Sequence, residues 1–383
     1  MIPYGKQDIT KEDIDAVVEV LKSDFLTQGP QVDKFQTAIS NYTNASYSVA
    51  FNSATSALHC ACLALNLKEN DWLWTSPITF VASANCALYC GANVDFIDID
   101  PDTYNMCPKA LENKLIEAEK SSKLPKVVVP VHLSGQPCDM KTFKKLSNKF
   151  GFKIIEDASH SVGGKYLNEP IGSCSYSDIT VFSFHPVKII TTGEGGVATT
   201  NTPELAERMK LLASHGITRD ASKMTHESEG AWYYQQIDLG FNYRMTDIQA
   251  ALGLSQLNRL DDYVALRHRF AERYDDLLRN LPLSTPYQHS DGYSAFHLYI
   301  IRLRDNKKRD YVFDYLRKNG IGANIHYIPV HKQPYFKEKN VKYRNLNISE
   351  EYYKDALSIP LYPSMTERQQ DEVVSCLKKA FKL

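Results

Sequence analysis

The chain has 383 residues, of which 43% are hydrophobic and 23% are charged, and this composition is that of an ordinary globular protein with a large core. Its 44 Lys and Arg residues balance 45 Asp and Glu residues to a formal net charge of -1, which excludes a general attraction to nucleic acid or to an anionic membrane. The length favours one large domain and a smaller one over a small binding module.

The N-terminal segment carries Lys6, Asp8 and 11–13, all charged, which leaves no room for the apolar core of a signal peptide. No apolar run reaches the roughly 18 residues of a membrane span. We therefore expect a cytoplasmic protein without a membrane partner. Eight cysteines are scattered along the chain without CxxC pairs, so we expect buried free thiols and no metal or redox site.

The first elements in chain order lead to a possible anion site. Thr10 and Asp13 have the spacing of a capping box and begin a helix, and Gly29–Pro30 marks the loop before a second helix. A strand at 47–51 then runs into 52–58, a helix start rich in small hydroxyl residues. The free N–H groups and the dipole of such a helix attract phosphate, although a plain capping role for Ser and Thr stays open.

Strands and helices alternate over the next hundred residues. The predicted strands are nearly all apolar, which favours a mostly parallel sheet covered by helices on both faces, an α/β fold with its ligands at the carboxyl ends of the strands. Asp157 ends one of these strands, where a buried acid needs a positive partner, and a helix-capping role is an equally open alternative. The strands are expected at 71–75, 94–98, 126–131 and 153–157, with helices opening at 78–85 and covering 140–150.

Lys188 lies between an aromatic strand end at 182–184 and a Gly-rich turn at 191–196. This position holds its amine beside a rigid backbone, which suits a lysine with a chemical role. An ordinary surface charge is the alternative for a lysine considered alone.

The remaining elements complete a large lobe and open a second one. A strand at 196–200 precedes a helix, a polar and irregular loop is expected at 218–236, and a composition shift at 282–286 marks the connection to a C-terminal α+β lobe. The elements expected beyond Lys188 are helices at 205–212, 248–257 and 260–281, a strand at 296–303, a helix at 311–318 and a terminal helix from Thr366.

Several motifs that define other enzyme classes are absent from the sequence. GxGxxG, Walker A, GxSxG and HExxH do not occur, and the 11 histidines lack ligand spacing. Dinucleotide, nucleoside triphosphate, serine hydrolase and zinc protease functions therefore have no support, and no DNA-binding signature is present.

Six short motifs occur in an order and spacing that closely resemble the DegT/StrS family of pyridoxal-phosphate-dependent nucleotide-sugar aminotransferases, with Asp157 31 residues before Lys188. The motifs are 52–58, 130–137, 156–160, 183–188, 193–196 and 240–244. The resemblance spans nearly the whole chain. It implies a fold-type I aminotransferase with a large cofactor-binding domain at 1–258, built on a mostly parallel, seven-stranded type of sheet between helices, and a smaller α+β domain at 259–383.

The resemblance also implies roles for individual residues. Lys188 would hold the cofactor aldehyde covalently and shuttle a proton, and Asp157 would pair with the pyridine nitrogen. Phe80 would stack on the cofactor ring. Phosphate contacts would come from Ala54, Thr55 and Ser183 and, across a homodimer interface, from the partner's copy of Asn242.

One departure from the common family pattern concerns His160, where many members carry Gln near the phenolic oxygen of the cofactor. A branch with Ser-His here, the PseC-type enzymes of pseudaminic acid synthesis, aminates UDP-linked 4-keto-6-deoxy-N-acetylhexosamines. The resemblance therefore implies a UDP-linked keto sugar as acceptor and L-glutamate as donor, in a ping-pong reaction through pyridoxamine phosphate. The candidate walls of the sugar site are Thr27, Gln28, Arg244, His326 and Tyr327.

Three alternatives remain beside this one. The acceptor could be a different nucleotide sugar, such as a dTDP- or GDP-4-keto-6-deoxyhexose. Sister enzymes that act as sugar dehydratases carry His in place of the Schiff-base lysine, which the presence of Lys188 argues against. The family also includes proteins proposed as regulators, although nothing in this sequence requires such a role.

Overall fold

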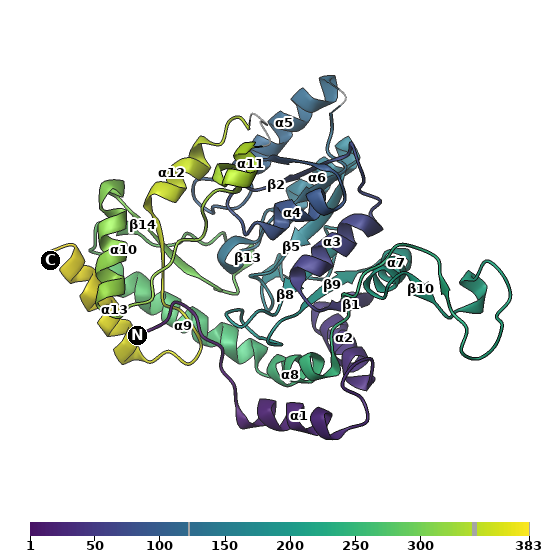
Figure 1. Ribbon diagram of the computed structural model, residues 1–383. Coiled ribbons are helices and arrows are strands. Elements are labelled where there is room, and N and C mark those ends of the chain that lie inside the picture. The colour runs from purple at the N-terminus through teal and green to yellow at the C-terminus, as the bar shows by residue number, and fades with distance from the viewer. Residues whose placement is uncertain (122, 339–342, 383) are drawn as a thin grey trace.

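The computed structural model describes residues 1–121, 123–338 and 343–382, and its central layer is a seven-stranded sheet (Figure 1). Six strands run in the same direction, and only β9 is antiparallel to both of its neighbours. The expected α/β fold with a mostly parallel sheet is confirmed. In spatial order the strands are β1 (Tyr47–Phe51), β9 (Gly196–Thr200), β8 (Ile179–Ser183), β5 (Lys153–Asp157), β4 (Val127–Val129), β2 (Trp72–Thr75) and β3 (Asn93–Phe96).

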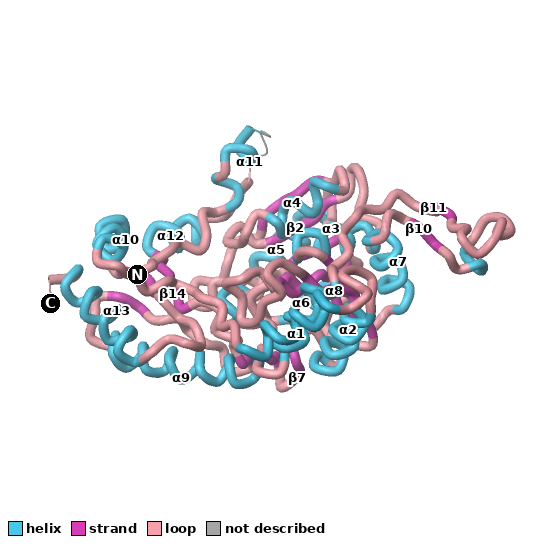
Figure 2. Tube along the Cα trace, turned by 60° about the horizontal axis from the view of Figure 1, so that its bottom comes forward, coloured by secondary structure: helices cyan, strands magenta, loops and turns pink. Residues whose placement is uncertain are grey.

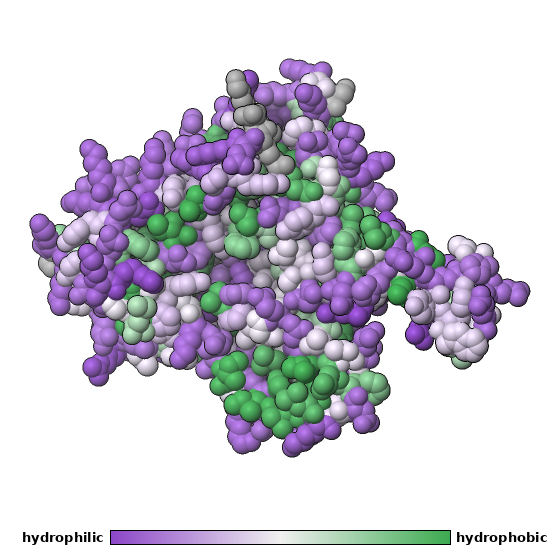
Figure 3. Space-filling model, viewed as in Figure 1, coloured by the Kyte–Doolittle hydropathy of each residue, from purple (hydrophilic) through white to green (hydrophobic). Residues whose placement is uncertain are grey.

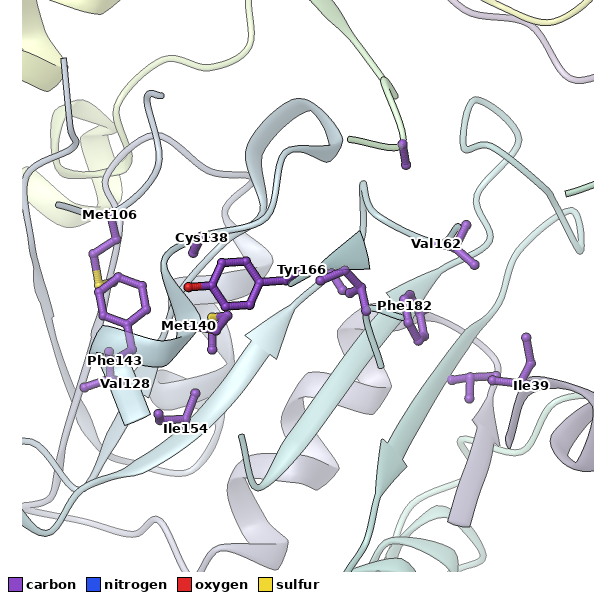
Figure 4. Packing of buried hydrophobic residues seen from close by; sticks show 14 of the residues in the cluster. Ile39, Met106, Val128, Cys138, Met140, Phe143, Ile154, Val162, Tyr166 and Phe182 are labelled. Carbon is purple, nitrogen blue, oxygen red and sulfur yellow. The ribbon is translucent and has the colours of Figure 1, made fainter. Parts of the chain in front are cut away.

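Helices cover both faces of this sheet, which is why its strands are apolar almost throughout. Alternate residues of one strand enter different cores, as Val128 packs on one face while Val127 and Val129 pack on the other. Figure 4 shows the first core, where Val128 and Ile154 of the sheet meet Phe143. That face carries α2 (Pro30–Thr43), α5 (Pro108–Lys120), α6 (Met140–Phe150) and α8 (Asp247–Leu257), and the other carries α3 (Ala54–Ala64), α4 (Ala82–Tyr89) and α7 (Pro203–Ala213).

The N-terminal helix α1 (Lys11–Lys22) packs on α8 at the edge of the large lobe. The capping box predicted for Thr10 and Asp13 is present. Asp13 is fully buried, and both of its carboxylate oxygens accept from Arg259 Nη2 at 2.7 and 2.8 Å. The same carboxylate therefore caps α1 and fastens it to Arg259, which directly precedes the next helix.

The C-terminal lobe has its own core around a three-stranded antiparallel sheet. Helix α9 (Leu260–Leu278) joins the lobes, because its first turns pack in the large core and its later turns pack in the small one. Ile2 also packs in the small core, and the domain boundary at 258/259 stays a prediction. The lobe contains β12 (Leu283–Ser284), β14 (Tyr299–Leu303), β15 (Ala356–Ile359), α10 (Arg309–Lys318), α11 (Pro334–Glu338), α12 (Asn347–Asp355) and α13 (Glu367–Ala380).

Two small sheets complete the fold. One joins β13 (Gly292–Tyr293) to β6 (Lys165–Tyr166) and β7 (Glu169–Pro170), which connects the lobes by main-chain hydrogen bonds. The other pairs β10 (Ile217–Thr218) with β11 (Gln235–Gln236) at the base of an arm that projects from the body in Figures 1 and 2.

The arm occupies the segment expected to be an irregular loop, so its paired base was not foreseen. Its exposed side chains include Trp232 and Tyr234, at 73% and 50% exposure. In the described part of the chain, no helix combines the length and the apolar character needed to cross a membrane.

Candidate active site

A cavity of about 550 Å³ lies at the carboxyl ends of the parallel strands, between the sheet and the segment 324–327 of the C-terminal lobe. The structure brings nine predicted residues together in its wall, although they are spread over more than 270 positions of the sequence. These are Ala54, Thr55, Phe80, Asp157, His160, Ser183, Lys188, His326 and Tyr327.

Lys188 belongs to the loop that follows β8, where its backbone N–H donates to the His185 carbonyl at 2.9 Å. Burial lowers the pKa of its amine to about 8, against the opposing charges of Asp157 and Glu194. An appreciable fraction of the amine is therefore neutral near pH 7. This is the state in which an amine can act as a nucleophile or accept a proton.

Asp157 is the last residue of β5 and is 4% exposed. Ser83 Oγ donates to one of its carboxylate oxygens at 2.6 Å, and the Ser159 N–H donates to the other at 3.1 Å. No helix begins between residues 158 and 164, so the helix-capping alternative for Asp157 is wrong. Within the described residues no cationic side chain forms an ion pair with it, which leaves a buried acid for a ligand to satisfy.

Glu156 precedes Asp157 and points to the other face of the sheet, because side chains alternate along a strand. There it contacts His132 Nε2 at 2.8 Å and accepts from Ser177 and Thr180. Burial alone would raise the pKa of Glu156, but these hydrogen bonds outweigh it and lower the pKa. Of two adjacent acids, only Asp157 is thus turned toward the cavity.

The N-terminus of α3 opens into the cavity. Ser53 caps the helix by accepting from the Ser56 N–H at 3.1 Å, so the capping role considered for this segment is present. Ala54 and Thr55 follow it, and as the first two helical residues they have N–H groups without an intrahelical acceptor. The capping role and the anion site are therefore compatible, since the cap uses a different N–H.

Gly196 brings the start of α3 close to the sheet. A Cβ atom at this position would stand 2.5 Å from the Ala54 nitrogen and 2.6 Å from the Ala54 Cα. Only glycine allows this approach without a shift of the helix start.

His160 and Tyr327 join the large lobe to the C-terminal lobe across the cavity. The Ser134 N–H donates to His160 Nδ1 at 3.2 Å, which places the ring proton on Nε2, 3.1 Å from Tyr327 Oη. Burial, assisted by the nearby charge of Lys188, holds the pKa of His160 well below its usual range. His160 is therefore a neutral donor, and the hydroxyl proton of Tyr327 is left for another acceptor.

His326 is fixed by polar neighbours in the same wall. Its Nδ1 lies 2.7 Å from Ser358 Oγ, and its Nε2 lies 3.3 Å from the side-chain nitrogen of Asn324. Burial, together with the charge of Lys188, lowers the pKa of His326 to about 3. The two histidines of the wall are thus uncharged at neutral pH.

Phe80 lies in the loop before α4, because that helix begins at Ala82 rather than at the expected Ile78. Thr79 and Ser83 contact each other through their hydroxyls at 2.7 Å across this boundary. In its loop position Phe80 is 59% exposed, with its ring centroid 6.4 Å from that of Tyr327. A flat ring in the cavity can pack against it.

Four predicted residues do not line the cavity formed by a single chain. Thr27 forms a backbone bridge with Thr246, and the neighbouring Gln28 is exposed. Asn242 accepts at its carbonyl from the Asn52 side chain at 3.3 Å, and Arg244 forms a bridge with the last residue of β1. The substrate and cross-subunit roles of these residues stay predictions.

The cavity also contains residues that the sequence did not identify as a site. Tyr4 and Asn324 come from opposite ends of the chain and carry no local signal. Glu194 lies in the Gly-rich turn after Lys188. Its position within that motif could have indicated that it belongs to the site. Ser83 lies behind the wall of the cavity, and only its hydrogen bond to Asp157 reveals it.

Pyridoxal phosphate, the cofactor that the motifs imply, fits this set of groups. An amine of low pKa can bind an aldehyde, a buried carboxylate without an ion-pair partner can hold a protonated ring nitrogen, and free N–H groups at a helix start can bind a phosphate. Lys188, Asp157 and the 54–55 segment supply these groups in one cavity.

Comparison with known proteins agrees with this arrangement. The DegT/DnrJ/EryC1/StrS aminotransferase family matches residues 7–378. A UDP-4-amino-4,6-dideoxy-N-acetyl-beta-L-altrosamine transaminase of Campylobacter jejuni serotype O:23/36 is 37% identical over 389 residues, covering 100% of this chain and 99% of the relative.

Solved structures extend the comparison to the fold. Helicobacter pylori PseC, described as an aminotransferase involved in the biosynthesis of pseudoaminic acid, superimposes with a TM-score of 0.91 at 31% identity, over 100% of this chain and 99% of its own. A Streptococcus pneumoniae protein in its PLP-form superimposes with a TM-score of 0.89 at 28% identity, over 100% and 98% of the two chains. The chain therefore belongs to the DegT/DnrJ/EryC1/StrS family and is a sugar aminotransferase that depends on pyridoxal phosphate.

Proposed function

We propose that this enzyme transfers an amino group from L-glutamate to the C4 ketone of a UDP-linked 4-keto-6-deoxy-N-acetylhexosamine. The observation that carries the proposal is the meeting of Lys188, Asp157 and the α3 N-terminus in one cavity. The printed names of the Campylobacter jejuni and Helicobacter pylori relatives support the sugar class. The Ser159-His160 pair supports the same branch of the family.

Pyridoxal phosphate, when bound, supplies an aldehyde for the amino group and a ring that withdraws electrons from the reacting carbon. Lys188 would hold the aldehyde end of the cofactor through Nζ, and the same nitrogen would move a proton at the reacting carbon. Its pKa of about 8 lets that nitrogen both accept and return a proton near neutral pH.

Other groups of the chain bind and orient the cofactor and substrate. Asp157 would keep a proton on the ring nitrogen, and the N–H groups of Ala54 and Thr55 would bind the phosphate dianion. Ser83 in turn orients the carboxylate of Asp157. Phe80 would pack on the ring.

The C-terminal lobe closes the cavity from the side opposite the sheet. His326 and Tyr327 stand there, and Tyr327 receives a hydrogen bond from His160. In this proposal they contact the sugar and exclude water from the reacting carbon. Thr27, Gln28 and Arg244 complete the sugar site.

We further propose that the active unit is a homodimer with shared sites. One face of the molecule is apolar over α1 and α8 (Figure 3), and Ile14, Leu21, Phe25 and Leu26 are each between 46% and 55% exposed. An apolar face of this kind favours burial against another surface. A second copy would also supply an Asn242, a residue that is not part of the wall of this cavity in its own chain.

The substrate proposal is tested by incubating the purified holoenzyme with L-glutamate and a panel of UDP-, dTDP- and GDP-4-keto sugars while following 2-oxoglutarate release. We expect turnover with the UDP-linked N-acetylated sugar and none in the Lys188→Ala variant. Turnover confined to dTDP- or GDP-sugars would reject the proposed acceptor while leaving the aminotransferase assignment unchanged.

A further inference from the structure

Four of the eight cysteines gather between two neighbouring helices. Cys60 and Cys62 lie on α3, Cys86 lies on α4, and Cys90 directly follows α4. The two helices pack against each other on one face of the sheet (Figure 1). None of these four thiols is among the described residues that line the cavity, so the reaction above leaves them unused.

The side chains of His59 and Cys62 share one face of α3, since residues three positions apart on a helix are neighbours. Both lie within side-chain contact of the Cys90 thiol. Cys62 also contacts Cys86, but the Cys86 thiol donates to the Ser83 carbonyl at 3.3 Å. Cys62 and Cys90 are in side-chain contact within one packed cluster, and among the described residues no backbone carbonyl competes for either thiol.

His59 supplies a second indication that points to Cys90. The ring is 5% exposed and is enclosed by Tyr89, Phe241 and Tyr243 at centroid distances of 4.8 to 5.9 Å. Its Nδ1 lies 3.3 Å from the Tyr243 hydroxyl. Its Nε2 is buried and lacks a partner of normal hydrogen-bond geometry in the described chain. A sulfur anion at Cys90 would satisfy this nitrogen.

The thiols of the cluster differ in their ionisation. Hydrogen bonding from Cys62, helped by His59 and opposed by burial, lowers the pKa of Cys90 to about 6. Burial raises the pKa of Cys60 to about 12, and contacts with Cys86 and Cys90 raise that of Cys62. Cys90 is also partly exposed, whereas Cys62 is fully buried. One reachable thiolate therefore stands beside one thiol that solvent does not reach.

We propose that Cys90 and Cys62 form a reversible dithiol–disulfide pair, in which Cys90 reacts first with hydrogen peroxide and Cys62 then closes the disulfide. The Cys90 sulfur attacks one peroxide oxygen, the O–O bond breaks, and the leaving oxygen departs as water. The Cys62 sulfur next attacks the oxidised Cys90 sulfur and releases a second water. Two thiols are oxidised, and one hydrogen peroxide is reduced to two waters.

Metal binding by the same cluster is not supported. The residues that the structure describes contain no group of three or more His, Cys, Asp or Glu side chains arranged to hold a metal ion. The absence of CxxC pairs led us to expect only inert buried thiols. The tertiary contact between α3 and the end of α4 changes that expectation for Cys90.

The test treats the reduced holoenzyme with hydrogen peroxide, blocks free thiols with N-ethylmaleimide and maps peptides by mass spectrometry. We expect two of the eight thiols to be lost, a linked Cys62–Cys90 peptide, and full recovery with dithiothreitol. The Cys90→Ser variant should lose none, and Cys62→Ser should instead give a Cys90 adduct with dimedone. The matched control Cys107→Ser removes another partly exposed thiol. This variant should still lose two thiols when it is treated with hydrogen peroxide.

A measurement on the unmodified protein keeps the proposal testable if a variant fails to fold. With a pKa of about 6, the thiolate fraction of Cys90 at pH 7 is about 30-fold that of a thiol with an ordinary pKa. Iodoacetamide should therefore label Cys90 well before Cys107. Labelling of Cys90 no faster than Cys107, or a peroxide-induced link that excludes Cys90, would overturn the proposal.

Discussion

At the scale of single residues, the site depends on the ionisation of Lys188. Burial lowers its pKa, and the charges of Asp157 and Glu194 oppose this effect, so that the pKa falls to about 8 and no further. The reactivity of the lysine is thus set by the balance between burial and these two carboxylates.

We expect the amine of Lys188 in the cofactor-free protein to be labelled by an acylating reagent with a midpoint near pH 8. At pH 7 its neutral fraction is then about 300-fold that of an ordinary lysine. Competitive labelling with peptide mapping measures the midpoint. Asp157→Asn should move it lower, because the carboxylate favours the charged amine. A midpoint near pH 10.5 in the native protein would contradict the burial argument.

Three buried histidines around the cavity predict a loss of stability in acid. Burial holds the pKa values of His160, His297 and His326 below the unfolded value of about 6.5. Below pH 6.5 these three histidines bind protons in the unfolded chain but stay neutral in the native state. The free energy of unfolding therefore falls as the pH falls, by up to about 4 kcal/mol per pH unit for three groups.

Urea unfolding between pH 7 and pH 5 measures this slope. The His297→Gln variant should reduce it by about one third. Replacing His226, which lies on the surface of the arm, serves as the control and should leave the slope unchanged. An unchanged slope in His297→Gln would show that this histidine is not the source.

At the scale of elements, the site depends on where two helices begin. Helix α4 begins at Ala82, four residues later than expected, and this leaves Phe80 in a loop that faces the cavity. Helix α3 begins at Ala54, beside Gly196 of β9. The sheet therefore positions the start of α3, the proposed phosphate site, through a contact between backbones.

We expect Gly196→Ala to weaken both folding and cofactor binding. The added methyl would stand 2.5 Å from the Ala54 nitrogen, so the start of α3 must shift, at a cost of about 1–3 kcal/mol in unfolding free energy. Gly5→Ala is the matched control, since its nearest neighbour would be the Val187 Cβ at 3.7 Å. Unfolding curves and a titration with pyridoxal phosphate compare the two. If Gly196→Ala and Gly5→Ala change unfolding and cofactor binding equally, the close approach of Gly196 to Ala54 is not what limits this position.

At the scale of the whole molecule, one chain forms a cavity but leaves an apolar face and several motif residues outside it. The face over α1 and α8 includes Ile14 and Leu21, which are seven positions apart on the same side of α1. The proposed homodimer would bury this apolar face.

We expect Ile14→Glu to shift the protein from dimer to monomer and to lower activity, because a buried charge opposes association. Light scattering after size-exclusion chromatography reports the mass, and a folded monomer is checked by its circular dichroism. Ile116→Glu, an exposed isoleucine on α5, is the control and should remain dimeric. A fully active monomer would reject the shared-site proposal.

The sequence by itself determined the parts that depend on local pattern. Apolar strands alternating with helices indicated the parallel sheet, and the capping residues Thr10 and Asp13 located α1. Motif order predicted Lys188 and Asp157 as site residues, and the structure places both in the wall of one cavity. These features can be recognised in the sequence because strand burial, capping and catalytic chemistry each constrain residues at short or fixed spacing.

Only the tertiary structure decided which distant side chains meet. Tyr4, Asn324 and the His160–Tyr327 contact arise where the C-terminal lobe closes on the strand ends, and no local pattern records that approach. The packing of α3 on α4 likewise placed Cys62 beside Cys90. Such contacts join residues far apart in the chain, and they exist only because burial of the two cores fixes the elements relative to one another.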